Sequence, residues 1–381
     1  MQYRPFGKLD FQVSALGFGA MRLPILEGDT SKINEPEAVK MIRFAIDHGV
    51  NYVDTAWPYH VGQSEPVVGR ALADGYREKV KLATKLPVRF AQSASDFDRF
   101  LNEQLKRLQT DHIDFYLLHG LNKRTWPKAR DLGVLQWAQE AKRGGRFLHL
   151  GFSFHDDFDV FKEIIDHTDQ WEFCQIQYNY MDTEYQAGTK GLEYAAGKGL
   201  AVVIMEPIRG GALAKEPPQT VAQLWETAPV KRTAAEWALQ WVWNQPEVST
   251  VLSGMSTMEQ VIENVASAGR SAIDLLMPEE LALIERVQEE YRRLSPIPCT
   301  QCQYCMPCPN NVNIPGILGL YNDAFKYGDV KRAQFLYTIR VQEGETADQC
   351  QDCKECEEKC PQGIEISAWM KKADELLAAK K

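Results

Sequence analysis

The 381-residue chain lacks any apolar run close to the roughly 20 residues that a membrane-spanning helix needs. Its first residues, MQYRPFGKLDF, lack the apolar stretch of a secretory signal. Positive charge is also in deficit, because the formal net charge is −9, which argues against nucleic acid or an anionic membrane as a partner. We therefore expect a cytoplasmic protein that binds neither nucleic acid nor a membrane.

Cysteine is nearly absent from the first 298 residues, where Cys174 is the one example among the nine cysteines of the chain. The other eight form two dense runs after residue 298. A disulfide-rich module could have this density, but without an export signal a reducing compartment favours metal binding over disulfides. We predict that Cys174 is an inert thiol of the core.

Up to about residue 275, short apolar runs alternate with amphipathic segments of helical period, such as EAVKMIRFAIDHG and FDRFLNEQLKRLQ. Continuous apolar strands that alternate with helices predict a parallel sheet covered on both faces. A hydrophobic content of 44% is sufficient for a large core. The predicted strands comprise residues 13–20, 51–56, 80–85, 113–120, 148–154, 173–179, 200–207 and 248–254.

A third glycine is missing after the first of these strands. An open, doubly wound sheet normally carries G-x-G-x-x-G there, whereas LGFGAMRLP has two glycines and then a proline. Eight strand–helix repeats over about 250 residues are typical of a (β/α)8 barrel. We therefore predict an α/β fold of the TIM-barrel type, with its site at the C-terminal ends of the strands, and retain the open sheet as the alternative.

The pattern changes near residue 278. PEELALIERVQEEYRRL predicts a helix, which SPIP then ends. We expect a barrel of residues 1–278, a connecting helix of residues 279–295 and a small, mainly helical domain of residues 296–381. The small domain should contain a helical stretch between its two cysteine runs and a final helix, SAWMKKADELLAAKK.

Four polar residues occupy strand ends or the loops that follow them: Asp54, Tyr59, Lys85 and His119. Each alone has an ordinary structural interpretation, as a cap, a packing ring, a solvated cation or a core histidine. Together they have a chemical logic. A tyrosine is a poor acid at neutral pH, and a neighbouring ammonium lowers its pKa. A carboxylate keeps that ammonium charged, and a neutral imidazole can orient a carbonyl oxygen.

The first 275 residues resemble an aldo-keto reductase in the order and spacing of LGFGAMRL, NYVDTAWPY…SE, LATK, DFYLLH, LGFSFH, QIQYN and VLSGMSTMEQVIEN. The resemblance implies that Tyr59 donates a proton, Lys85 lowers its pKa, Asp54 orients Lys85 and His119 positions the substrate oxygen. It also implies a nicotinamide cofactor at the barrel mouth without a G-x-G-x-x-G motif. Trp57, His60 and His155 are candidates for the wall of the substrate pocket.

The resemblance also assigns the cofactor contacts. Gly19, Ala20 and Met21 would lie under the cofactor, Ser153 and Gln175 would hold the carboxamide, and Met205 would stack on the nicotinamide. The loop of Glu206, Pro207, Ile208, Arg209 and Gly210 would flank the pyrophosphate. The adenosine end would meet Gly254, Met255, Ser256, Gln260, Glu263 and Asn264.

This chain departs from the family pattern at several of these positions. Phe154 replaces a frequent Asn, and Met205 replaces an aromatic residue. Gly254 and Gln260 replace the Lys and Arg with which NADPH-preferring members bind the 2′-phosphate, so both NADP(H) and NAD(H) remain open. Arg270 or Lys231 could compensate for the two missing cations.

The cysteine runs have the spacing of iron–sulfur ligands. The second run is C-x2-C-x2-C-x3-C-P, as in bacterial two-cluster ferredoxins, and the first is one residue shorter before its last cysteine. Two [4Fe-4S] clusters in a ferredoxin-like domain are our prediction, and zinc held by four cysteines is the alternative. The resemblance to ferredoxins implies crossed ligation. One cluster would take Cys299, Cys302, Cys305 and Cys360, and the other Cys350, Cys353, Cys356 and Cys308.

The sequence therefore predicts an NAD(P)-dependent oxidoreductase that acts on a small carbonyl or alcohol substrate, with clusters that transfer electrons. One alternative is an electron-transfer protein that serves a redox protein partner. Because hydride carries two electrons and a cubane cluster usually one, such transfer needs a one-electron intermediary, and the sequence has no flavin motif. A second alternative gives the clusters a structural or oxygen-sensing function.

Overall fold

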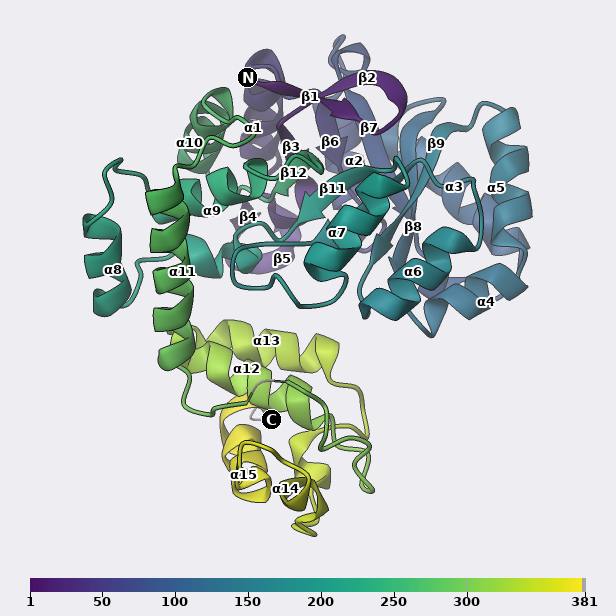
Figure 1. Ribbon diagram of the computed structural model, residues 1–381. Coiled ribbons are helices and arrows are strands. Elements are labelled where there is room, and N and C mark those ends of the chain that lie inside the picture. The colour runs from purple at the N-terminus through teal and green to yellow at the C-terminus, as the bar shows by residue number, and fades with distance from the viewer. Residues whose placement is uncertain (300, 379–381) are drawn as a thin grey trace. The chain divides into compact units, whose positions relative to one another are not determined.

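A computed structural model describes residues 1–299 and 301–378 of the chain (Figure 1). The chain packs as two compact units, which we call the barrel unit (residues 1–211 and 232–277) and the cysteine unit (residues 212–231 and 278 onward). The predicted domain limits at residues 278, 295 and 381 stay a prediction. The predicted end of the last helix, residues 379–381, and Thr300 of the first cysteine run lie outside the described residues.

The barrel unit contains a closed barrel of eight parallel strands, which confirms the predicted TIM-like architecture and excludes the open sheet. Every predicted strand is present within a few residues of its expected limits. Around the barrel the order is β10-β11-β12-β3-β6-β7-β8-β9. The strands are β3 (Leu16–Gly19), β6 (Tyr52–Asp54), β7 (Lys81–Leu86), β8 (Ile113–Leu121), β9 (Phe147–Phe154), β10 (Phe173–Gln177), β11 (Ala201–Met205) and β12 (Val248–Ser253).

Helices surround the barrel on its outer side (Figure 1). Their caps follow from the sequence: Asp157, Thr233 and Thr257 each accept a backbone N–H from the first turn of the next helix. The helices are α1 (Glu35–Asp47), α2 (Ser64–Ala71), α3 (Ser95–Leu108), α4 (Thr125–Asp131), α5 (Val134–Arg143), α6 (Phe158–Asp166), α7 (Gly188–Gly197), α9 (Ala234–Trp243) and α10 (Met258–Gly269).

An N-terminal hairpin closes one end of the barrel. It consists of β1 (Tyr3–Phe6) and β2 (Leu9–Ser14), which pair antiparallel. Phe6 is fully buried and packs against Tyr52, Phe115 and Phe173. Tyr52 and Phe173 are the first residues of their strands, so this aromatic cluster fills the N-terminal end of the barrel. The C-terminal strand ends, where sites form in such barrels, are left for the polar residues.

The cysteine unit is mainly helical. Its helices are α8 (Gln219–Glu226), α11 (Pro278–Arg293), α12 (Ile314–Lys326), α13 (Val330–Arg340), α14 (Glu355–Glu358) and α15 (Ile366–Leu377). Asn313 and Asp329 cap α12 and α13 through their side-chain oxygens. A separate core joins α12, α13 and α15, with Ile317, Met370 and Ala373 fully buried. Several cysteines of both runs pack against this core.

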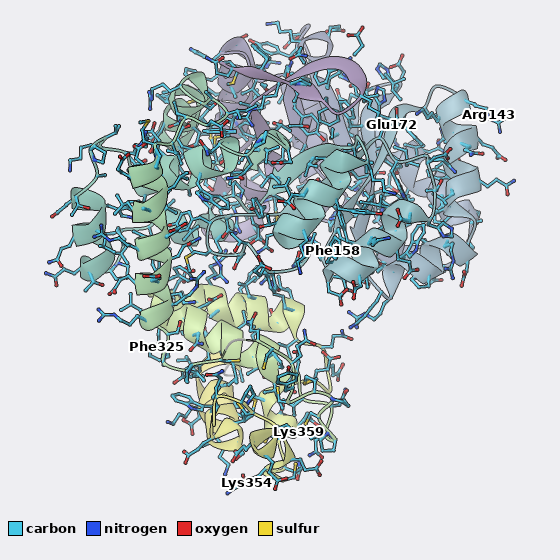
Figure 2. The ribbon with its side chains drawn as sticks, in the orientation of Figure 1. Arg143, Phe158, Glu172, Phe325, Lys354 and Lys359 are labelled. Atoms are coloured by element: carbon cyan, nitrogen blue, oxygen red, sulfur yellow. The ribbon has the colours of Figure 1, made fainter. Side chains whose placement is uncertain are left out.

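In both units charged side chains such as those of Arg143 and Lys354 lie at the surface (Figure 2).

A smaller hairpin of β4 (Ile25–Leu26) and β5 (Asp29–Ile33) follows the first barrel strand. Among the described residues, no helix has the length and apolar character to cross a membrane.

Candidate active site and cysteine clusters

Three of the four predicted catalytic side chains come from adjacent strands. Asp54 is the last residue of β6, Lys85 is the penultimate residue of β7, and His119 lies near the end of β8. These strands are neighbours in the barrel, with Asp54 opposite Ala83 and Lys85 opposite Leu117. Tyr59 opens the short 3-10 helix Tyr59–Gly62 that follows β6. The structure therefore places all four at the C-terminal mouth.

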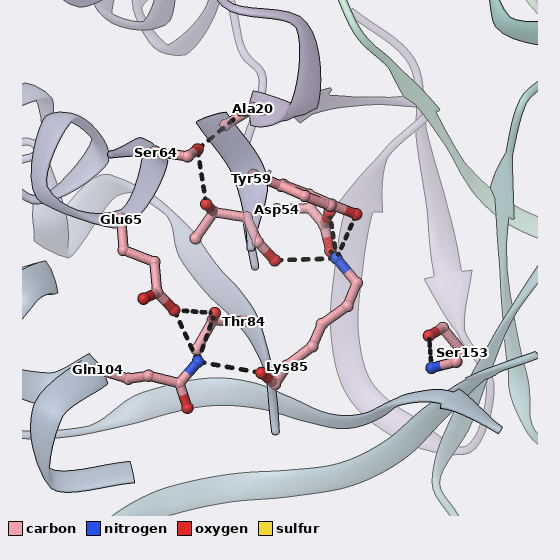
Figure 3. A network of polar contacts seen from close by, with 11 residues as sticks. Ala20, Asp54, Tyr59, Ser64, Glu65, Thr84, Lys85, Gln104 and Ser153 are labelled. Atoms are coloured by element: carbon pink, nitrogen blue, oxygen red, sulfur yellow. Dashed lines mark hydrogen bonds and ion pairs between the residues drawn. The ribbon is translucent and has the colours of Figure 1, made fainter. Parts of the chain in front are cut away.

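The Lys85 ammonium is the centre of this site (Figure 3). Lys85 is fully buried, and its Nζ donates to both carboxylate oxygens of Asp54 at 2.6 and 2.7 Å and to the carbonyl of Thr55 at 2.9 Å. A longer hydrogen bond of 3.4 Å joins Nζ to the Tyr59 hydroxyl. The ammonium thus bridges the carboxylate and the phenol, as the sequence chemistry requires.

Burial and charge act in opposite directions on the Lys85–Asp54 pair. Burial alone would lower the pKa of Lys85, but Asp54 and Tyr59 raise it above its ordinary value. Burial raises the pKa of Asp54, and the ammonium offsets part of that rise. The two side chains lie at ion-pair distance, and either one would be an unpaired buried charge without the other.

The Tyr59 phenol is less acidic than the sequence predicts. Burial raises its pKa above the ordinary value of 10 and outweighs the lowering by Lys85. The sequence shows the ammonium beside the phenol but not how deeply both are enclosed, so the net direction differs from the expectation. Tyr59 therefore carries its proton at neutral pH, which suits a proton donor.

His119 faces the Tyr59 ring edge-on, with ring centroids 6.0 Å apart. Its pKa is well below 6.5, first because of burial and then because of Lys85, His155 and Arg89. The imidazole is therefore neutral, as predicted, and can form a hydrogen bond with a carbonyl oxygen beside the phenol.

A buried polar network supports the strand that carries Lys85, and the sequence analysis missed it (Figure 3). Glu65 is fully buried and accepts hydrogen bonds from Thr84 at 2.7 Å and from Gln104 at 2.6 Å. Gln104 also donates to the carbonyl of Lys85 at 3.0 Å. Arg107 pairs with Glu65 at 3.3 Å and stacks on Trp57, 3.8 Å from the ring centroid. The sequence signal that could have indicated this network is Glu65 itself, an acidic residue in the first turn of a helix whose neighbouring residues are apolar.

Ser153 and Gln175 lie side by side, because they are register partners on β9 and β10. Both are buried. Ser153 accepts the N–H of Gly120 at 2.8 Å, whereas the Gln175 carbonyl oxygen has no hydrogen-bond partner among the described residues. An orphaned amide oxygen next to a hydroxyl fits a ligand carboxamide, so these residues suit the predicted nicotinamide. Met205 ends the adjacent strand β11.

The predicted pyrophosphate loop has an unusual backbone. Glu206, Arg209 and Gly210 all have positive φ, and Pro207 and Ile208 lie between them. Asn179 donates to the carbonyl of Glu206 at 3.2 Å, and Arg209 pairs with buried Asp182 at 3.0 Å. This loop is therefore tied to the segment after β10.

Asp182 is a second buried carboxylate that the sequence analysis missed. Gln177, Asn179 and Arg209 all donate to it. Burial would raise the pKa of Asp182, but Arg209 and these hydrogen bonds lower it below its ordinary value. The carboxylate is thus ionised and holds the loop in place.

The predicted adenosine-end residues lie in the first two turns of α10 and in the turn before it. The N–H of Ser256 donates to the Gln260 amide oxygen at 2.8 Å, and the Ser256 hydroxyl donates to the carbonyl of Arg22 at 2.8 Å. The buried Asn264 donates to Ser253 at 3.0 Å. Buried Met255 follows Gly254, and Glu263 on α10 accepts a hydrogen bond from Thr233.

Both cations proposed to compensate at this end have partners within the protein. Arg270 pairs with Glu236 at 2.8 Å. Lys231 belongs to the cysteine unit and donates to the carbonyl of Glu226 at 2.5 Å. Arg22, which no sequence pattern marked, also lies at this end: a Cβ on Gly254 would lie 3.3 Å from the carbons of its side chain. Its stem occupies the space that a side chain at position 254 would use.

The first predicted cysteine set lines one small cavity. Cys299, Cys302 and Cys305 of the first run and Cys360 of the second run surround it. Burial, followed by the proximity of the other three thiols, raises the pKa of Cys305 to about 11. The structure therefore brings the last cysteine of the second run to the first run.

The second set is also mixed. Burial raises the pKa of Cys356 to about 11, with Cys308 and Cys350 among the neighbouring groups that contribute to the rise. The amide of Asn310, which follows the first run, lies 4.0 Å from the sulfur of Cys353. Cys353 is exposed, as is Lys354 beside it (Figure 2).

The two runs share a backbone pattern despite their different length. Gln301 and Gln303 have positive φ in the first run, and Asp352 and Lys354 have positive φ at the matching places in the second. Each pair flanks the second cysteine of its run.

Within the described residues, no three His, Cys, Asp or Glu side chains lie close enough together to hold a single metal ion. Cys174 is fully buried in the barrel unit, and burial raises its pKa, as expected of an inert thiol.

Two family models match the chain. The model of the Aldo/keto reductase family covers residues 15–289, and a model described as a 4Fe-4S dicluster domain covers residues 298–365. The second match favours the predicted iron–sulfur clusters over the zinc alternative.

Individual proteins match the first part of the chain. L-galactose dehydrogenase of Arabidopsis thaliana is 27% identical over 77% of this chain and 97% of its own length. The NADH-specific methylglyoxal reductase of Escherichia coli is 26% identical over 75% of this chain and 100% of its own length. The holo form of aldo-keto reductase AKR11C1 from Bacillus halodurans superposes with a TM-score of 0.63 at 30% identity, over 75% of this chain and 96% of that chain.

Proposed function

The chain belongs to the aldo/keto reductase family and carries a 4Fe-4S dicluster domain, and on that premise we propose that it interconverts a small carbonyl compound and its alcohol with a nicotinamide cofactor. The observation that supports this most directly is the Lys85 ammonium, which bridges Asp54 and the Tyr59 hydroxyl at the barrel mouth. When bound, the nicotinamide supplies or accepts the hydride at the substrate carbon. The residues of the chain manage the proton and the oxygen.

In the reducing direction, the Tyr59 hydroxyl donates its proton to the carbonyl oxygen. Lys85 stabilises the phenolate that remains, since its ammonium already contacts the hydroxyl at 3.4 Å. Asp54 holds the ammonium in place and charged. Neutral His119 donates a hydrogen bond to the same substrate oxygen and fixes its approach. Solvent returns the proton to Tyr59 after the product leaves.

Tyr59→Phe tests this assignment because it removes the proton and keeps the ring. We expect kcat for reduction of small aldehydes to fall by about 10²-fold or more, as for the loss of a general acid. Nicotinamide binding, followed by fluorescence titration, should change little. Turnover within a factor of two of the wild type would contradict the role given to Tyr59.

We propose that the chain accepts NADH at least as well as NADPH. A 2′-phosphate is bound by paired cations. Here positions 254 and 260 are Gly and Gln, Arg270 is paired with Glu236, and Arg22 beside Gly254 is a single cation. One similar protein is named an NADH-specific reductase. The ratio of kcat/KM for the two cofactors measures the preference. A preference for NADPH of tenfold or more would overturn this proposal.

A second proposal concerns the clusters. Cys302 and Cys353, one from each set, are exposed, which favours electron exchange with a redox protein partner over a purely structural function. If electrons pass between cofactor and clusters, the two electrons of the hydride must divide, one to each cluster, with release of a proton. NADH or NADPH alone should then produce the EPR signal of reduced [4Fe-4S] under anaerobic conditions. A signal with dithionite but none with either nicotinamide would favour separate functions for the two parts of the chain.

A further inference from the structure

The two residues that follow Tyr59 have a backbone conformation that side chains disfavour. His60 and Val61 have φ of 52° and 54°, in the left-handed region that is rare for non-glycine residues and rarer still for β-branched ones. Val61 is 72% exposed, whereas His60 is buried. Such a conformation persists only where surrounding contacts fix it. Because the Val61 side chain is exposed, we look to the contacts of the buried His60.

Both ring nitrogens of His60 are engaged by backbone groups of other segments. Nε2 accepts the N–H of Leu23 at 3.1 Å, and Nδ1 lies 2.8 Å from the carbonyl oxygen of Thr30. Because a carbonyl oxygen can only accept, Nδ1 carries the proton and the imidazole is the neutral Nδ1–H tautomer. Both ring nitrogens are therefore engaged by backbone groups of the protein itself.

The partners of His60 lie in the segment that includes the expected floor of the cofactor site. Leu23 directly follows the 3-10 helix Ala20–Arg22, and the carbonyl of Met21 also faces the ring. Thr30 lies in β5 of the small hairpin. A second tie is close by, since the Ser64 hydroxyl donates to the carbonyl of Ala20 at 2.8 Å. The segment that carries Tyr59 is therefore joined to the segment with Ala20 and Met21 through both His60 and Ser64.

We propose that His60 is a positioning residue that fixes the Tyr59 hydroxyl relative to the bound nicotinamide, chiefly through its hydrogen bond from Leu23. This inference rests on the proposed function, because it concerns the distance between proton donor and hydride donor. The Tyr59 hydroxyl and the nicotinamide would be held by separate loops, and both must reach the same substrate carbonyl. A tie between those loops sets their spacing, and misplacement of about 1 Å can cost a large factor in rate.

Three substitutions separate the contacts of His60. His60→Gly keeps the left-handed backbone and removes both bonds. His60→Gln places an amide oxygen near the Nε2 position, where it can accept the Leu23 N–H. His60→Asn places an amide nitrogen near the Nδ1 position, where it can donate to Thr30. Val61→Gly is the matched control, because it relaxes the adjacent left-handed residue and removes an exposed side chain.

We expect kcat with NADH to fall about 10- to 100-fold in His60→Gly and His60→Asn, with KM for the carbonyl substrate changed less than about threefold. His60→Gln should stay within about threefold of the wild type, and Val61→Gly within about twofold. Dinucleotide Kd should rise with the loss of the Leu23 bond. A His60→Gly enzyme equal to Val61→Gly, or a His60→Gln enzyme as slow as His60→Gly, would overturn the proposal.

Hydrogen exchange of the Leu23 amide provides a readout that needs neither cofactor nor turnover. Protection should be lost in the Gly and Asn variants and kept in the Gln variant. If the wild type binds no dinucleotide, the proposed function is wrong, and Leu23 protection still decides whether His60 ties the two loops. Unchanged protection in His60→Gly would show that the loops are held by other contacts and would refute the tie itself.

Discussion

Lys85 determines the charge balance of the site, because its ammonium neutralises the buried Asp54 and approaches the Tyr59 hydroxyl. The pKa of the proton donor is itself raised by burial, and the ammonium limits that rise. His119 stays neutral because its pKa is well below 6.5. Tyr59 is thus protonated and His119 is thus neutral at physiological pH.

This assignment predicts the pH dependence of the reaction. Reduction needs protonated Tyr59, whose pKa lies above 10, so kcat should be flat between about pH 6 and 9 and fall only at higher pH. Oxidation needs the phenolate and should accelerate as pH rises. No acidic limb near pH 6.5 is expected from His119. Steady-state rates in both directions, in buffers of constant ionic strength, measure this. A basic limb for reduction near neutral pH would contradict it.

Lys85→Met removes the charge that lowers the pKa of Tyr59, so the basic limb should move to still higher pH and kcat should fall by about 10²-fold. The variant leaves Asp54 buried and unpaired, which costs about 3–5 kcal/mol of stability. The double variant Asp54→Asn with Lys85→Met is the control, since it removes both charges. Circular dichroism should show that both variants are folded. A basic limb of the kcat profile that moves to lower pH in Lys85→Met would refute the role of the ammonium.

Asp182 gives a prediction for stability. Its folded pKa is below its ordinary value, so its contribution is present above about pH 4 and is lost as pH falls through the folded pKa. Asp182→Asn should lower the melting temperature at pH 7, and the difference from the wild type should shrink in more acidic buffer. The dinucleotide Kd should also rise, because the pyrophosphate loop loses the ion pair between Arg209 and Asp182. A difference that grows with acidity would contradict this account.

At the scale of elements, periodicity predicted the barrel strands because strands buried on both sides are continuous apolar runs. It did not separate β2 from β3, since the predicted strand of residues 13–20 contains the end of the hairpin and the start of the barrel. Asp54, Tyr59, Lys85 and His119 could be found because strand ends are visible in a sequence. Glu65, Asp182 and His60 could not be assigned, because their partners come from distant segments whose packing no local pattern encodes.

The packing of α2 on α3 leads to a prediction about elements. A Cβ on Gly69 would lie 2.7 Å from the carbonyl oxygen of Arg107 and 2.8 Å from the backbone of Leu108. Gly69→Ala should therefore destabilise the barrel unit by about 1–3 kcal/mol, as overpacking does. Gly197→Ala is the control: it is exposed at the end of α7 with open space around it, and should be neutral or stabilising. Urea denaturation compares them, and equal midpoints would refute the close approach.

At the scale of the whole molecule, the cysteine unit has its own core and draws each cysteine set from both runs. The spacing of the cysteines indicated clusters, and the resemblance to ferredoxins indicated the crossed assignment. The first run is one residue short, so spacing alone left the position of Cys308 open. The left-handed residues on each side of the second cysteine show that both runs have the same local backbone conformation there despite their different lengths.

Crossed ligation predicts the iron content of paired variants. If Cys299 and Cys360 serve one cluster, then Cys299→Ala, Cys360→Ala and the double variant should each retain about half of the iron of the wild type, since all three lose the same cluster. Cys350→Ala combined with Cys360→Ala removes a ligand from each cluster and should lose nearly all iron. Cys174→Ala is the control and should keep the full amount. Iron analysis after anaerobic reconstitution decides the matter: if the Cys299 and Cys360 pair loses all iron while the Cys350 and Cys360 pair keeps half, each run binds its own cluster.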